Sequence, residues 1–107
     1  MTRLIIYRDD ANREPFSEWI SRLRDHVAQT RIQFRLRMAQ AGHLGDTRSV
    51  GGGVFEMRIH VGQGYRVYYG RQGDALIILL CGGSKSTQKD DIQAAQGYWA
   101  DWRRRIR

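Results

Sequence analysis

The residues best suited to chemistry lie in one stretch, residues 53–85, where polar and apolar side chains alternate. Two runs, residues 55–61 and 65–69, carry apolar residues at every second position, which predicts strands with one apolar and one polar face. The polar face would gather charged and hydroxyl side chains from both runs. These candidates are Glu56, Arg58, His60, Arg66 and Tyr68, with Lys85 just after the next apolar run.

The basic candidates suit chemistry at a phosphate. The guanidinium groups of Arg58 and Arg66 can hold a phosphate and stabilise charge that builds on it during transfer. Lys85 adds a further positive charge, and the imidazole of His60 is a side chain suited to moving protons. Glu56 is a candidate general base, which adjacent arginines would hold ionised.

Two interpretations of this face remain open, a catalytic surface and a solvated surface without catalysis. Tyr68 offers a hydroxyl or a ring on which a base can stack. The chain shows neither zinc-ligand spacing nor a Ser-His-acid arrangement, which leaves cleavage of RNA without a metal or cofactor, because the 2′-OH of RNA supplies its own nucleophile. The alternative is that Glu56, Arg58 and Arg66 form only cross-strand ion pairs on a solvated sheet surface.

Flanking residues predict the elements that position this stretch. Residues 3–7 form a short β-prone run, and Pro15 suits the first turn of a helix with apolar residues at helical spacing. Asp25 suits the N-cap of a second helix, which Gly42 ends; the alternative is that the two segments form one kinked helix. Residues 43–53 are rich in Gly, Asp, Thr and Ser and predict a loop.

The remaining segments predict an antiparallel sheet and a last helix. Glycine-containing turns at residues 61–64 and 70–74 are short enough to join antiparallel neighbours. Residues 82–85 are expected to end the last strand, and Ser86 or Thr87 to cap a helix with an apolar stripe. The predicted fold is α+β, in the order β-α-α-β-β-β-α, within a single domain of residues 1–107. We expect its helices mainly on one face of the sheet, with the other face partly open.

Composition adds constraints on partners and location. The 18 basic residues give a formal net charge of +7, which favours a polyanion such as RNA, DNA or an acidic protein, the alternative being a basic surface with no specific partner. The single cysteine, Cys81, excludes an internal disulfide and is expected to be buried. Apolar runs are too short for a signal peptide or a membrane span, so we expect a cytoplasmic protein without membrane contact.

Several short motifs together resemble one toxin family. They are Phe-Glu-Met-Arg-Ile at 55–59, Gly-Tyr-Arg-Val-Tyr-Tyr-Gly at 64–70 and Leu-Leu-Cys-Gly-Gly-Ser-Lys at 79–85, with residues 16–25 and 42–46. This combination resembles the phage-derived Gp49-like, HigB-type branch of the RelE/ParE toxin superfamily. The resemblance implies the toxin of a type II toxin–antitoxin addiction module, an endoribonuclease that cuts mRNA on the ribosome and so inhibits translation. A small antitoxin, often with a helix-turn-helix domain, would silence it.

The resemblance also implies roles for individual residues. Arg58 and Arg66 match basic residues of the family motif, and Lys85 falls near a third. RelE itself has another basic residue where this chain has Glu56, and a tyrosine in the region of residues 88–92, where this chain has none. His60, Glu56 or Tyr68 must therefore supply the acid and base. A ParE-like gyrase inhibitor without nuclease activity and a non-toxic nucleic-acid-binding module remain the alternatives.

Overall fold

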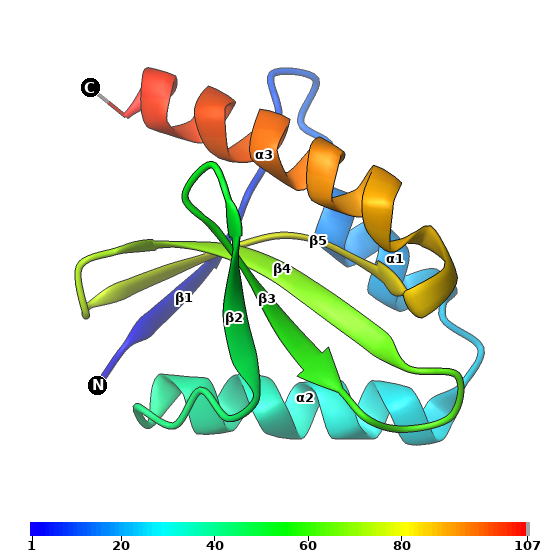
Figure 1. Cartoon of the computed structure of the whole chain (residues 1–107). Coiled ribbons are helices and arrows are strands. Elements are labelled where there is room, and N and C mark those ends of the chain that lie inside the picture. Colours follow the sequence, from blue (N-terminus) through cyan, green and yellow to red (C-terminus); the bar gives the residue numbers. More distant parts are fainter. Residues whose placement is uncertain (107) are drawn as a thin grey trace.

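A five-stranded sheet organises the computed structural model, which describes residues 1–106 (Figure 1). The strand order is β1-β5-β4-β3-β2; the pairs are antiparallel except β1 with β5, which is parallel. The α+β prediction is thereby confirmed. The elements are β1 (Arg3–Ile6), α1 (Pro15–Arg22), α2 (His26–Gln40), β2 (Thr47–Gly51), β3 (Val54–Ile59), β4 (Tyr65–Gln72), β5 (Leu76–Ser84), a 3-10 turn (Lys85–Thr87) and α3 (Gln88–Arg105).

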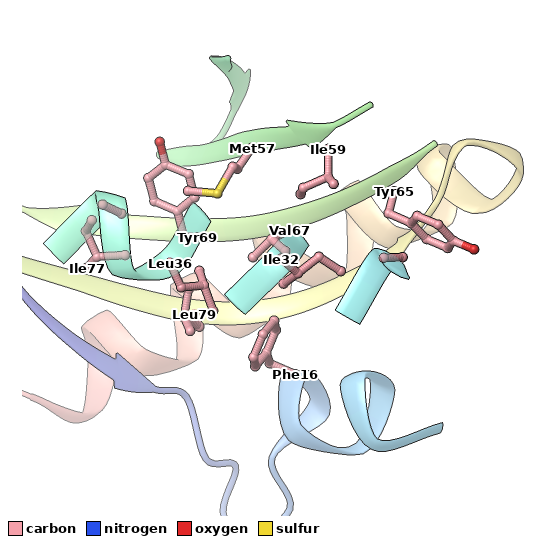
Figure 2. Packing of buried hydrophobic residues seen from close by; sticks show 12 residues of the cluster. Phe16, Ile32, Leu36, Met57, Ile59, Tyr65, Val67, Tyr69, Ile77 and Leu79 are labelled. Atoms are coloured by element: carbon pink, nitrogen blue, oxygen red, sulfur yellow. The ribbon is translucent and has the colours of Figure 1, made fainter. Parts of the chain in front are cut away.

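Helices α1 and α2 lie on one face of the sheet, and α3 covers the middle of the other face, which was expected to be partly open. Figure 1 shows α2 on one side of the sheet and α3 crossing the other side. On the α2 side, Met57, Val67 and Tyr69 of β3 and β4 meet Ile32 and Leu36 of α2 in a buried cluster (Figure 2). Phe16 of α1 belongs to the same cluster, so α1 and α2 share this face.

The second cluster lies beneath α3. Val54, Tyr68 and Leu80 of the sheet are buried against Ala95 and Trp99 of α3. A bulge between β4 and β5 contributes to this packing, because the pairing passes from Tyr68–Cys81 to Tyr69–Leu79 and leaves Leu80 as an extra residue. The alternation that predicted a polar face therefore fails where α3 covers the middle of β4.

Cys81 belongs to this second cluster, as the sequence predicts. It is 7% exposed, and burial raises the pKa of its thiol to about 12. A thiol with such a pKa stays protonated near neutral pH, so Cys81 acts as a small apolar side chain rather than as a nucleophile.

Two segments differ from the sequence-based prediction. Residues 47–51 form the edge strand β2 instead of a loop; the run lacks apolar alternation, because its side chains are half-buried or exposed on the margin of the sheet. Strand β5 continues to Ser84 through Gly82 and Gly83. A Cβ at Gly82 would lie 2.3 Å from the ring of Trp19 in α1, so this glycine marks a close approach rather than a strand end.

Gly70 of β4 offers a test of the packing under α3. A Cβ at this position would lie 2.2 Å from the ring of Trp99, so Gly70→Ala should lower the free energy of unfolding by about 1–3 kcal/mol through overpacking. Gly97 is the matched control, because it is exposed on α3 with nothing near its Cβ position. Gly97→Ala should raise stability by about 0.5–1 kcal/mol. Urea denaturation measures both, and equal effects would contradict the packing described.

Candidate phosphate site at the turn end of the sheet

A hollow of about 510 Å³ lies where the turn between β3 and β4 meets the end of β5. Four of the six candidate residues line it, namely Arg58, His60, Arg66 and Lys85. The backbone N–H of Lys85 donates to the carbonyl of Gly64 at 3.1 Å, which fixes the start of the 3-10 turn beside the hairpin. The sheet therefore brings together side chains that are up to 27 positions apart in the sequence.

Arg58 and Arg66 are direct cross-strand partners in the antiparallel pair β3–β4. Like charges in such a pair repel each other, so the arrangement needs compensation. Each guanidinium has its own carboxylate: Asp46 lies 2.7 Å from Nη2 of Arg58, and Glu56 lies 3.3 Å from Nε of Arg66. The two positive groups can therefore share one wall of the hollow.

Asp46 holds both Arg58 and His60. Nε and Nη2 of Arg58 donate to its Oδ1 at 3.1 and 2.7 Å, and Nε2 of His60 bonds to its Oδ2. The hydrogen bond from Arg58, reinforced by that from His60, holds the pKa of Asp46 below its usual range. The side chain of His60 is 72% exposed, so its imidazole is oriented by Asp46 and still open to solvent.

Arg35 of α2 fixes the loop that carries Asp46. Its Nη1 donates to the carbonyl of Arg58 at 2.6 Å, and its Nη2 donates to the carbonyl of Leu44 at 3.0 Å. Burial lowers the pKa of this guanidinium. Helix α2 therefore supports the site from behind the sheet.

Glu56 and Tyr68 do not lie on an open face, and that expectation is wrong. Glu56 is 0% exposed because the first turn of α3 covers it. Its Oε2 accepts hydrogen bonds from Nε2 of Gln88 at 2.8 Å and from the hydroxyl of Tyr68 at 3.3 Å, and its Oε1 accepts from Nε of Arg48 at 3.0 Å. Burial, aided by the charge of Glu56, raises the pKa of the Tyr68 hydroxyl.

Arg48 is a candidate that sequence reasoning missed. It lies opposite Glu56 in the β2–β3 pair and so projects from the same face as Arg58 and Arg66, with its side chain 51% exposed. The glycines of residues 51–53 all have positive φ and turn β2 into β3. Three consecutive glycines before a strand were the available sign of a hairpin, which would have placed Arg48 on the sheet.

The site keeps a net positive charge. Arg58, Arg66 and Lys85 line the hollow with three cations, and Arg48 adds a fourth beside it on Glu56, whereas Asp46 and Glu56 bring two carboxylates. Such an arrangement can hold an anion with several negative oxygens, and a phosphate group fits that description. Within residues 1–106, no cluster of three His, Cys, Asp or Glu side chains is arranged to hold a metal ion, and no helix is long and apolar enough to cross a membrane.

Fold and site together define a small α+β protein with a positively charged hollow at one end of its sheet. Residues 18–96 match the family described as phage derived protein Gp49-like (DUF891), and the chain belongs to this family. An uncharacterized protein of Haemophilus influenzae (strain ATCC 51907 / DSM 11121 / KW20 / Rd) is 49% identical over 81 residues, which cover 76% of this chain and 82% of that protein. The resemblance seen in the motifs is confirmed, and family membership is consistent with a toxin–antitoxin module.

Glu56 provides a test of how the site is held. Glu56→Gln keeps the side-chain shape but leaves Arg66, which is 13% exposed, without its carboxylate, so the free energy of unfolding should fall by about 3–5 kcal/mol. Asp74→Ala is the matched control, because that carboxylate is exposed and lies 3.4 Å from Arg71; it should change stability little. Chemical denaturation measures both variants. A loss at Glu56 no larger than that at Asp74 would contradict the role assigned to the buried charge.

Proposed function

We propose that this chain is the toxin of a type II toxin–antitoxin pair and a metal-independent, ribosome-dependent endonuclease that cuts mRNA in the cytoplasm. The observation that carries the proposal is the meeting of Arg58, Arg66, Lys85 and His60 around one hollow. Membership of the Gp49-like family supports the toxin class. The inhibition of translation would follow from the loss of intact mRNA.

The proposed reaction uses a nucleophile that the substrate carries. The 2′-oxygen of a ribose attacks the adjacent phosphorus, the bond from phosphorus to the 5′-oxygen breaks, and a 2′,3′-cyclic phosphate and a 5′-hydroxyl form. One proton leaves the 2′-OH and one reaches the 5′-oxygen. The protein must therefore hold the phosphate, stabilise charge on its free oxygens and move a proton.

Each lining residue has one of these tasks in the proposal. Arg58 and Arg66 hold the free phosphate oxygens through N–H donors, and Lys85 adds charge from the end of β5. His60 takes the proton from the 2′-OH and delivers it to the departing 5′-oxygen, because its imidazole is exposed and oriented by Asp46.

Glu56 and Tyr68 act indirectly in the proposal. Both are buried, so they are placed to hold Arg66 in position and not to touch the reacting atoms. The raised pKa keeps the Tyr68 hydroxyl protonated, and this hydroxyl donates a hydrogen bond to Glu56.

The proposed partner is a cognate antitoxin, a small helix-turn-helix protein. The net charge of +7 would attract an acidic segment of such a partner. Their association rate would then fall as salt is added, because exposed charges are screened.

The proposal predicts specific losses of activity. His60→Ala and Lys85→Ala should each lower cleavage of a reporter mRNA by about 100-fold in a reconstituted translation reaction, and should relieve the growth arrest caused by expression of the wild-type chain. Both residues are exposed, so folding should survive. Lys89→Ala is the matched control, because Lys89 is exposed on α3 and is not among the residues lining the hollow; this variant should remain toxic.

Other outcomes would favour the alternatives. A toxic Arg58→Ala/Arg66→Ala double variant would reject the assigned site. Growth arrest with intact transcripts and an induced DNA-damage response would indicate a gyrase inhibitor. Harmless expression of the folded wild-type chain would indicate a nucleic-acid-binding module.

A further inference from the structure

A second, larger hollow lies along the C-terminal half of α3, and its volume is about 970 Å³. Its walls are α3, the β2–β3 turn at Gly53 and the β4–β5 turn at Gln72 and Gly73. The phosphate site shares none of its lining residues. Strand β3 begins beside this groove and ends beside the phosphate site, so the two lie at opposite ends of the sheet.

The groove has an apolar floor. Phe55, Trp99, Trp102 and Ile106 line it, and the rings of Trp99 and Trp102 stack with centroids 5.3 Å apart and planes inclined by 8°. Ile106 is 48% exposed, so a partner seated in the groove can cover it. Binding of a partner that removes this apolar floor from water lowers the free energy of the complex.

The rim of the groove is positively charged. Arg71, Arg103 and Arg104 line it, and no Asp or Glu does so among the described residues. Arg104 pairs with Asp101 at 2.6 Å and Arg71 with the exposed Asp74 at 3.4 Å. Arg103 is exposed and forms no ion pair with any residue that the structure describes, so its charge is available to a partner.

We infer that this groove binds an acidic amphipathic segment of the antitoxin, with apolar side chains on the aromatic floor and carboxylates against the rim arginines. The identity of the partner rests on the proposed function, whereas its chemistry rests on the groove. An apolar centre with a charged rim is the usual anatomy of a surface that receives an amphipathic helix. The rim carries arginine side chains, so charge complementarity favours a segment with negative charge.

The same geometry disfavours RNA as the occupant. Single-stranded RNA binds aromatic residues by stacking bases on open ring faces. Here Trp99 is only 6% exposed, and its ring is stacked on that of Trp102. Because the Trp99 ring is covered in this way, the floor suits leucine-like side chains better than bases.

Occupation of the groove would leave the phosphate site uncovered, because the two have no lining residue in common. The antitoxin would then hold the toxin through one surface and block the reaction by other means, such as its own bulk beside the ribosome. Because the surfaces are separate, a substitution in one can abolish peptide binding or RNA cleavage without affecting the other activity.

The test measures fluorescence anisotropy with the full-length chain and a labelled helical peptide that carries leucines on one face and glutamates on the other. We expect saturable binding that weakens as salt is added, and no binding of the same peptide with lysine in place of glutamate. Arg103→Glu and Ile106→Asp should each weaken binding by about tenfold. Arg31→Glu, on the exposed side of α2, is the matched control and should change the affinity by less than about twofold.

Three results would overturn the inference: no saturable binding of the acidic peptide, an equal loss with Arg31→Glu, or displacement of the peptide by a short single-stranded RNA whose affinity depends more strongly on Arg103.

Failure of the proposed function gives a different pattern. A wild-type chain that binds the peptide but does not cut mRNA rejects the nuclease and keeps the groove. Arg103→Glu should cut mRNA as the wild type does, since Arg103 lies outside the phosphate site.

Discussion

The charge of Glu56, buried between the sheet and the first turn of α3, ties four elements together. Its carboxylate meets Arg48 from β2, Arg66 and Tyr68 from β4, and Gln88 from α3, while Glu56 itself belongs to β3. Taking a carboxylate out of water costs several kcal/mol, and only a full set of partners offsets that cost. The positions of the edge strand, the central strand and the last helix are therefore linked through one side chain.

This link explains how two arginines can face each other across β3 and β4. Without Asp46 and Glu56, the repulsion between Arg58 and Arg66 would drive the side chains apart and open the hollow. Each carboxylate holds one guanidinium group, and both arginines still line the hollow. Their positive charge is therefore fixed in place before an anion arrives, as a preorganised anion site requires.

Much of the fold could be predicted from the sequence because its signals are local. Pro15 stands at the start of α1, and Asp25 caps α2 by accepting from the N–H of Ala28, as their types indicate. The α3 stripe and the two tight turns also follow from spacing. The parts that could not be predicted depend on contacts between distant segments: β2 is recognisable only once β3 is beside it, and Gly82 lies within a strand because Trp19 packs against it.

The candidate site also contains residues that the sequence predicted and residues that it did not. Arg58, Arg66, Lys85 and His60 could be assigned from alternation and motif, and the structure places them around one hollow. Alternation along a strand cannot distinguish a solvated face from one that a helix covers, so the burial of Glu56 and Tyr68 could not be predicted from it. Asp46 and Arg48 were missed because they lie in a segment without apolar alternation.

The hairpin turn of the hollow has a consequence for selectivity. Gly62 and Gly64, both with positive φ, line the hollow with bare backbone, so a nucleotide chain can approach closely. The neighbouring guanidinium and ammonium groups suit a phosphate, which every nucleotide shares. Under the proposed function, this wall does not distinguish one base from another. The choice of cutting position would then depend on whatever presents the RNA to this wall.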